Sequence, residues 1–122
     1  MNVKGVDFIF YNVSDMKKAV EFYRDVLGLK PLEEPGETWA EFNVGNATLS
    51  IGVYGSKATG PKDNVSVALS VDDVKESVAY LREKGVPVVQ DTFESGGCFM
   101  AIATDPDGNQ VILHHRKDGT VG

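Results

Sequence analysis

The sequence predicts an α+β fold: two paired βαβββ modules forming a curved mixed sheet with a central cup and the helices outside. The first observation is a repeat, because VSDMKKAVEFYR at residues 13–24 returns as VDDVKESVAYLR at residues 71–82, an offset of 58. The second is the shared context of the two copies, each of which follows a strand-like run and ends near a glycine. The third is that further strand-like runs follow each copy. Duplication of one supersecondary unit accounts for all three.

Length and composition fit a single domain. The chain has 122 residues, of which 42% are hydrophobic and 25% charged, as is usual for a globular protein with a sizeable core. We expect one domain over residues 1–122, made of a first module at about 1–55, a linker at about 55–63, a second module at about 64–115 and a tail at 116–122.

Charge and cysteine content exclude several function classes. From the net charge of −6 we expect neither nucleic acid nor an anionic membrane surface as a partner. No apolar run reaches the length of a membrane span, and the N-terminus has no signal-peptide pattern. The single cysteine, Cys98, excludes an internal disulfide, so we expect a cytoplasmic protein.

The first module begins with a strand at Val6–Val13, rich in aromatic and β-branched residues. Ser14 or Asp15 can cap a following helix, which Gly28 ends. The apolar stripe of this helix is Met16, Ala19, Val20, Tyr23 and Leu27. A short strand is expected at Leu29–Leu32.

The next two strands form a hairpin whose register can be predicted. Trp39–Val44 and Ala47–Tyr54 are separated only by Gly45-Asn46, a pair typical of a tight two-residue turn. If Val44 lies opposite Ala47, one side of the hairpin is apolar and should meet the helix. The other side pairs Asn43 with Thr48, Glu41 with Ser50, and Trp39 with Gly52.

The second module repeats this order. A strand at Val65–Val71 precedes a helix that starts at Asp72 or Asp73, with Glu76 placed to complete a capping box, and ends at Gly85. Val86–Val89 is a short strand, and residues 91–97 (DTFESGG) are expected to be a mobile loop. Phe99–Thr104 and Gln110–His114 form a hairpin around the turn at residues 105–108, with Thr104 opposite Asn109.

These registers predict which side chains face the cup. Side chains alternate along a strand, so every second residue shares a face. The predicted lining is Phe8, Phe10, Asn12, Trp39, Glu41, Asn43, Thr48, Ser50, Tyr54, Ser66, Ser70, Phe99, Ala101, Ile112 and His114. An apolar wall with a few polar anchors is typical of a ligand site. The alternative is that the aromatic residues simply fill a closed core, although Glu41 and the serines would be costly in one.

Four segments carry a family resemblance: FYRDVLGLKPLEE, WAEFNVGNATLSI, SVALSVDDV and DPDGNQVIL. In this order they resemble the glyoxalase/bleomycin-resistance/dioxygenase superfamily, also called the vicinal oxygen chelate fold. Many members hold a divalent metal through four strand residues. The resemblance places those positions at Phe8, Ser50, Ser66 and Ile112, which offer no imidazole or carboxylate, so we expect no metal and no cofactor.

Two functions follow from the resemblance and the lining. The first is a metal-free small-molecule-binding protein of the bleomycin-resistance branch, which sequesters a cationic or aromatic drug-like ligand. The second is a lyase, isomerase or dioxygenase with displaced metal ligands, or with Glu41 and His114 as an acid–base pair. Glu41 could instead be a rim carboxylate, and His114 a surface residue. The resemblance also implies a homodimer.

Overall fold

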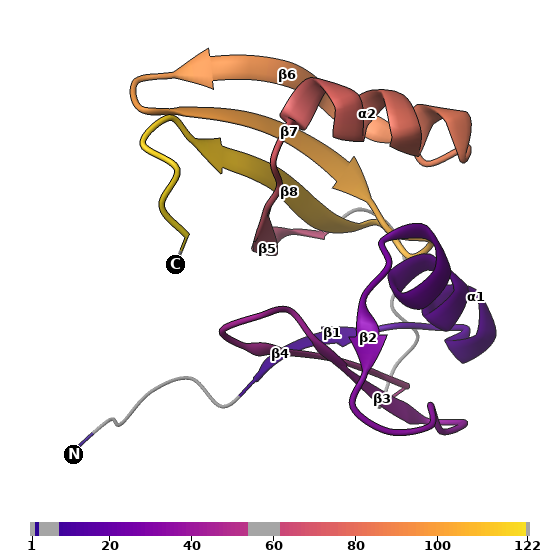
Figure 1. Cartoon of the computed structure of the whole chain (residues 1–122). Helices are drawn as coiled ribbons and strands as arrows, with labels where there is room; N and C mark the ends of the chain where they lie inside the picture. The colour runs from indigo at the N-terminus through magenta and orange to yellow at the C-terminus, as the bar shows by residue number, and fades with distance from the viewer. Residues whose placement is uncertain (1, 3–7, 54–61, 122) are drawn as a thin grey trace. The chain divides into compact units, whose positions relative to one another are not determined.

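The computed structural model describes residues 2, 8–53 and 62–121, which divide into unit 1 (Met1–Ala58) and unit 2 (Thr59–Gly122). Each unit contains one four-stranded mixed sheet and one helical segment (Figure 1). Both follow the order βαβββ, which confirms the predicted fold class. No helix in the described part of the chain is long and apolar enough to cross a membrane.

Unit 1 arranges its strands in the order β1-β4-β3-β2, with β1 parallel to β4 and the other pairs antiparallel. Its elements are β1 (Ile9–Asn12), α1 (Met16–Val20), the π-helix η1 (Glu21–Val26), β2 (Lys30–Pro31), β3 (Trp39–Asn43) and β4 (Thr48–Gly52). Within the β3–β4 hairpin, Trp39 lies opposite Gly52 and Glu41 opposite Ser50, as predicted. The Val44 amide donates to the Ala47 carbonyl at 3.1 Å and closes the turn.

The core of unit 1 lies between the sheet and its helix. Asp15 caps α1 by accepting a hydrogen bond from the Lys18 amide at 3.1 Å. The buried residues of this core are Tyr11, Val13, Met16, Ala19, Val20, Phe22, Tyr23, Ala40, Phe42, Leu49 and Ile51.

The predicted helical stripe is correct through Tyr23 and wrong at Leu27, which is only half-buried. The cause is η1, where the Leu27 amide donates to the Phe22 carbonyl, five residues earlier. The wider turn rotates the later side chains relative to a regular helix. Phe22 therefore joins the core, edge-on to Tyr23 with ring centroids 4.9 Å apart.

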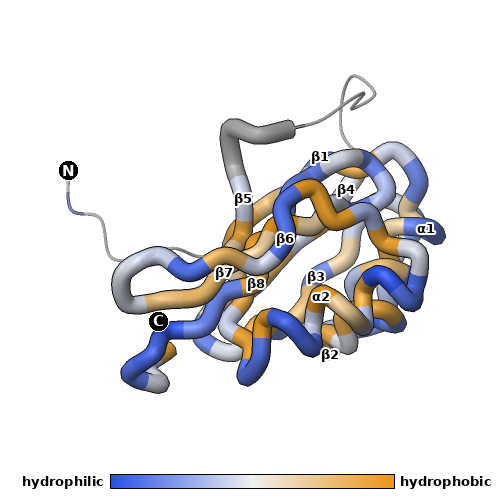
Figure 2. Tube along the Cα trace, turned by 90° about the horizontal axis from the view of Figure 1, so that it is seen from above, coloured by the Kyte–Doolittle hydropathy of each residue, from blue (hydrophilic) through white to orange (hydrophobic). Residues whose placement is uncertain are grey.

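Unit 2 has the strand order β5-β8-β7-β6, with β5 parallel to β8. Its elements are β5 (Lys62–Ser70), α2 (Val74–Glu83), β6 (Val88–Ser95), β7 (Cys98–Thr104) and β8 (Asn109–Arg116). The helix α2 lies along one face of the sheet (Figure 1). Hydrophobic and hydrophilic residues alternate along α2 (Figure 2). Its hydrophobic residues Val74, Val78 and Leu81 are buried, and the residues between them are mostly exposed.

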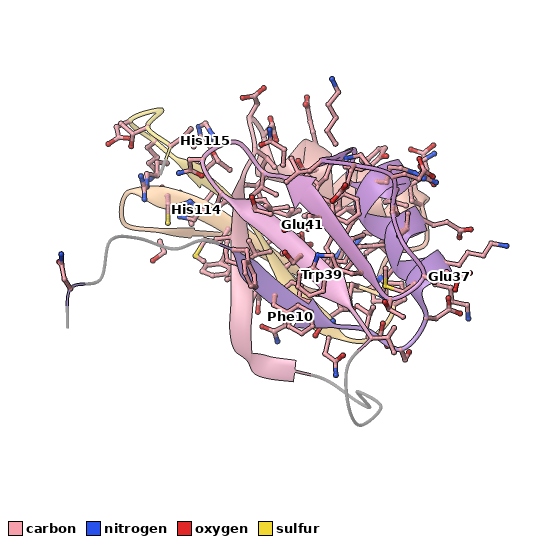
Figure 3. All side chains as sticks on the ribbon, turned by 90° about the horizontal axis from the view of Figure 1, so that it is seen from below. Phe10, Glu37, Trp39, Glu41, His114 and His115 are labelled. Carbon is pink, nitrogen blue, oxygen red and sulfur yellow. The ribbon has the colours of Figure 1, made fainter. Side chains whose placement is uncertain are left out.

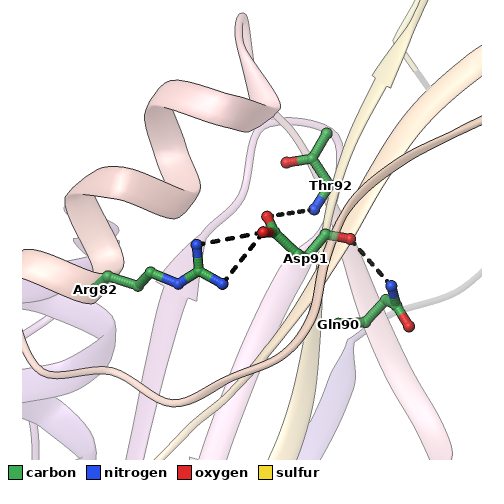
Figure 4. A network of polar contacts seen from close by, with 4 residues as sticks. All are labelled: Arg82, Gln90, Asp91 and Thr92. Carbon is green, nitrogen blue, oxygen red and sulfur yellow. Dashed lines mark hydrogen bonds and ion pairs between the residues drawn. The ribbon is translucent and has the colours of Figure 1, made fainter.

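Both ends of α2 are fixed by polar contacts. Asp73 accepts a hydrogen bond from the Glu76 amide at 3.0 Å, which is the first half of the predicted capping box. Near the other end, Arg82 forms an ion pair with Asp91 of β6 at 3.4 Å (Figure 4). The Thr92 amide, and to a lesser extent the Arg82 guanidinium, hold the pKa of Asp91 below its usual value.

The predicted mobile loop at residues 91–97 is wrong. Residues up to Ser95 belong to β6, and Ser95 pairs with Cys98 across a two-residue turn of Gly96 and Gly97. Glycine at both turn positions is a hairpin signal, and an edge strand tolerates polar residues because one side of it meets water. The β6–β7 hairpin consequently extends past the N-terminal end of α2 (Figure 1).

The predicted register of the last hairpin is also wrong, by one residue. Thr104 pairs with Gln110 rather than Asn109, and Phe99 pairs with His115 rather than His114. The reason is Asp105, whose carboxylate accepts bonds from the Asn109 backbone and side-chain amides, both at 2.8 Å. Asp105 and Asn109 therefore close a shorter loop of three residues that ends at Gly108, whose φ is 83°.

We expect Asp105→Ala to lower the free energy of unfolding by about 2 kcal/mol, because Asn109 is buried and would lose its hydrogen-bond acceptor. Urea denaturation followed by circular dichroism measures this loss. Glu83→Ala removes an exposed carboxylate from α2 and serves as the control. Equal stabilities of the two variants would show that Asp105 does not hold the turn.

Candidate functional site

The face of the unit 1 sheet opposite the helix carries an aromatic group beside a carboxylate. We call it the aromatic face and define it as Phe8, Phe10, Trp39, Glu41 and Ser50. The Phe10 and Trp39 rings are stacked, with centroids 5.4 Å apart and planes 11° apart (Figure 3). Phe8 meets Trp39 edge-on at 6.0 Å and is 48% exposed. The sequence grouped all five residues, and the structure brings them together.

Gly52 allows the Trp39 ring to lie against β4. A Cβ atom at Gly52 would stand 2.9 Å from Trp39 Cε3, 3.0 Å from the Thr38 carbonyl oxygen and 3.1 Å from Phe10 Cε1. These separations are below normal carbon contact distances, so only glycine leaves room for both rings. The sequence placed Gly52 opposite Trp39 but did not indicate this steric role.

The polar residues of the aromatic face contact one another. Ser50 is fully buried, and its Oγ donates to Glu41 Oε2 at 3.4 Å. This bond orients the half-buried Glu41 carboxylate on the same side of the sheet as Trp39 (Figure 3).

Three other predicted residues of unit 1 stand apart from this group. Asn43 is exposed, and its Oδ1 accepts a hydrogen bond from the Gly45 amide at 2.7 Å, which supports the hairpin turn. Asn12 and Thr48 are half-buried at the ends of their strands. Tyr54 lies outside the described residues, as does most of the predicted linker.

In unit 2 the face opposite α2 carries a second group of predicted residues. Ser66 pairs with Gln110, and its Oγ donates to Gln110 Oε1 at 3.3 Å. Ser70 pairs with His114, which is half-buried. Ile112 shares this face, because it lies two residues from each of Gln110 and His114.

Residues that the sequence analysis missed also belong to this face, among them Phe93, Met100 and Ile102, which lies opposite Ile112. The observed register places Met100 opposite His114 and Phe93 opposite Met100. Phe93 was missed because the sequence of residues 91–97 predicted a loop. Met100 was missed because the predicted register of the last hairpin was wrong by one residue. The signal for Phe93 is the Gly96-Gly97 pair, because two glycines between strand-like runs indicate a hairpin and would extend the strand back over Phe93.

Phe99 and Ala101, by contrast, do not share the face of Ile112 and His114. The corrected register turns them to the helix side, where Ala101 is fully buried and Phe99 lies opposite His115. His115 Nδ1 is 2.9 Å from the carbonyl oxygen of Val71, which lies between β5 and α2. A pocket of about 330 Å³ lies here, lined by Asp72, Asp73, Val74, Lys75, Thr92, Phe99 and His115.

The four positions where the resemblance implies metal ligands do not fit a divalent ion. Phe8 and Ile112 have no donor atom, and the hydroxyls of Ser50 and Ser66 are neutral groups already bonded to Glu41 and Gln110. No group of three or more His, Cys, Asp and Glu side chains elsewhere in the described ranges is arranged to hold a metal.

The chain belongs to the Glyoxalase/Bleomycin resistance protein/Dioxygenase superfamily, whose sequence profile matches residues 5–113. It is 31% identical over 120 residues to the metallothiol transferase FosB of Staphylococcus epidermidis, covering 92% of this chain and 84% of that protein. It is 28% identical over 123 residues to the lactoylglutathione lyase of Salmonella typhimurium, covering 90% of this chain and 91% of the lyase.

Solved structures agree with this membership. TnmS3, an antibiotic binding protein from a Streptomyces species, superposes with a TM-score of 0.77 at 26% identity and covers 95% of this chain and 98% of its own. A lactoylglutathione lyase from Agrobacterium tumefaciens has a TM-score of 0.75 at 19% identity, over 99% of this chain and 100% of the lyase, and supports the fold alone.

The Gly52 contact gives a test of how the aromatic face is built. We expect Gly52→Ala to push the Trp39 ring off Phe10 and to lower the unfolding free energy by about 2 kcal/mol. Near-ultraviolet circular dichroism of the single tryptophan should lose intensity. Gly97→Ala is the matched control, since a Cβ there meets nothing within 4 Å. An unchanged Trp39 spectrum in Gly52→Ala would contradict this account.

Proposed function

We propose that this protein is a metal-free small-molecule-binding protein whose aromatic face takes a planar, cationic ligand. The observation that carries the proposal is the stacked Phe10–Trp39 pair with the Glu41 carboxylate on the same side of the sheet. Aromatic rings offer a flat apolar surface and attract cations through their π-faces. A neighbouring carboxylate adds a charge that selects a cation over a neutral molecule of the same shape.

The residues at the family's metal positions support binding over metal chemistry. The hydroxyls of Ser50 and Ser66 bond to neighbouring side chains, so the buried Ser50 orients Glu41 and the half-buried Ser66 is held beside Gln110. Half-buried groups held in this way, such as Glu41, are suited to contact a ligand with little loss of conformational entropy. The similarity to TnmS3 agrees with a binding role, because that protein is an antibiotic binding protein.

A second candidate is an enzyme of the lyase, isomerase or dioxygenase type, in keeping with the identity to FosB and lactoylglutathione lyase. Its acid–base groups would be Glu41 and His114, which belong to different units. Ser50 donates to Glu41, so the carboxylate is already oriented by a neighbour, as a general base requires. Such an enzyme would either hold a metal ion through displaced ligands or turn over a substrate with Glu41 and His114 alone.

We also propose, from the resemblance, that the protein forms a homodimer and that it acts in the cytoplasm. Neither proposal enters the ligand argument above, because the aromatic face is built from residues of one unit of one chain.

Titration with N-methylquinolinium, quinoline and quinoline-2-carboxylate tests the ligand class. We expect the cation to change Trp39 fluorescence saturably and to bind at least about tenfold more tightly than the neutral or anionic ring, the size of one charge-assisted contact. Glu41→Gln should remove most of that preference. Calorimetry gives the affinities independently of the optical signal.

Glu37→Gln is the matched control for this titration, because Glu37 is exposed near the start of β3 and away from Glu41 in Figure 3. It should leave the preference for the cation unchanged. Equal binding of all three compounds, or equal effects of the two variants, would contradict a role for Glu41 in charge selection.

Metal content separates the two candidate functions. We expect protein purified without chelator to contain substoichiometric amounts of every divalent ion, because the four family positions lack metal-binding side chains. Inductively coupled plasma mass spectrometry measures this directly. One equivalent of a transition metal that is lost in Glu41→Gln or His114→Ala would instead favour the enzyme with displaced ligands.

A further inference from the structure

Three side chains with sulfur and nitrogen donor atoms gather on the unit 2 sheet, on the face opposite α2. We call them the soft-donor set and define it as Cys98, Met100 and His114. Cys98 and Met100 are two residues apart on β7, so their side chains share a face, and Met100 pairs with His114 of β8, which Figure 3 labels. The set combines a thiol, a thioether and an imidazole on two adjacent strands.

The pairing of β7 with β8 sets the spacing of the three side chains. Residues directly opposite each other on antiparallel strands have Cβ atoms about 5 Å apart, and diagonal neighbours are about 7 to 8 Å apart, within reach of long side chains. Met100 and His114 are a direct pair, whereas Cys98 pairs with Arg116 and is a diagonal neighbour of His114. One ion above this part of the sheet can therefore contact a donor atom from each.

The register of the last hairpin, which Asp105 fixes, is what brings the set together. It places Met100 rather than Phe99 opposite His114. A slip of one residue would turn the thioether to the helix side and put a phenyl ring, which has no donor atom, in its place.

The donor atoms of the set are accessible. All three side chains are half-buried rather than enclosed. His114 forms no hydrogen bond or ion pair with any residue that the structure describes, and a neutral imidazole carries one nitrogen lone pair. Cys98 Sγ donates to the Ser95 carbonyl at 3.3 Å, but a thiol is a weak hydrogen-bond donor. An ion could therefore bind here without breaking a strong contact.

The surroundings of the set suit a bound ion. Phe93 lies opposite Met100 and is 37% exposed, and Ile112 precedes His114 by two residues on the same face. Apolar neighbours limit the access of water to an ion, and an aromatic ring attracts a cation through its π-face.

The donor types and the local charge select a soft monovalent ion. Thiolate and thioether ligands favour Cu(I), whereas hard divalent ions prefer oxygen ligands. The set contains no carboxylate, and its thioether is neutral. Arg116 pairs with Cys98, and its positive charge repels a divalent ion twice as strongly as a monovalent one at the same distance.

We propose that the soft-donor set is a binding site for Cu(I). The Cys98 thiol releases its proton to solvent as its sulfur binds the ion, and the Met100 sulfur and one His114 nitrogen complete the coordination with no change of oxidation state. The site shares no residue with the aromatic face or with the four positions where the resemblance implies metal ligands. It therefore stands independently of the function proposed above.

Anaerobic transfer of Cu(I) from the coloured chelator bicinchoninate to the full-length protein tests the proposal. We expect one equivalent of Cu(I) to move to the protein, and an equimolar amount of Zn²⁺ not to displace it. NMR of protein labelled in its methionine methyl groups gives a second readout, with Ag(I) as a diamagnetic probe. The Met100 methyl signal should shift, and that of Met16, which is buried in unit 1, should not.

Variants assign the donors. Cys98→Ser, Met100→Leu and His114→Gln should each weaken Cu(I) binding at least about tenfold, because loss even of a residue that only supports a metal ligand has an effect of this size. His115→Gln, on the helix side of β8, is the matched control and should bind like the unmodified protein. Glu41→Gln should also keep Cu(I), which distinguishes this site from the displaced metal ligands of the second candidate function.

The proposal is overturned if no Cu(I) leaves the chelator, if Zn²⁺ displaces it, or if the Met100 methyl signal does not shift with Ag(I). It is also overturned if only Cys98→Ser among the three donor variants weakens binding, because the ion would then be held by a cysteine thiolate alone.

Discussion

The alternation of side chains along paired strands is the constraint on which the rest of this structure depends. A one-residue slip in any hairpin would exchange the side of a sheet that faces the helix with the opposite side. In unit 1 the Gly45-Asn46 turn prevents this, because it leaves only one pairing between two short strands. Phe42 and Leu49 are buried as a result, and Trp39 and Glu41 are left on the opposite side. The aromatic face is thus a consequence of two turn residues.

The same constraint explains what the sequence could and could not predict. The two modules, the helix caps and the β3–β4 register were predictable, since turn type and apolar periodicity agree there. The last hairpin was not, because its loop length is decided by the Asp105 carboxylate and its bonds to Asn109. Hydrogen bonds between a side chain and the backbone leave no periodic trace in a sequence. That single residue moved Phe99 from the predicted site to the other face of the sheet.

Two further differences have similar causes. The polar stretch before Gly96 reads as a loop, although an edge strand can carry polar residues on a side that meets water. The change from α1 to the π-helix η1 brings Phe22 into the core, whereas its counterpart in the repeat, Tyr80, is 41% exposed on α2. The two repeated segments of twelve residues therefore form different helices. Phe22 and Tyr23 both pack into the unit 1 core, whereas Tyr80 stays exposed on α2.

The two units share a common scaffold and differ in their surfaces. In unit 1 the strand after the helix, β2, has two residues, so no long hairpin is built from it. The corresponding strand of unit 2, β6, has eight residues and supplies Thr92 to the pocket beside α2. In both units, polar side chains opposite the helices bond to one another, as Ser50 does to Glu41 and Ser66 to Gln110. Hydroxyls and amides are neutral hydrogen-bonding groups, whereas a metal ion would need charged or imidazole ligands with free lone pairs. The chemistry of these side chains therefore supports the proposed recognition of a small molecule by shape, charge and hydrogen bonding over metal chemistry.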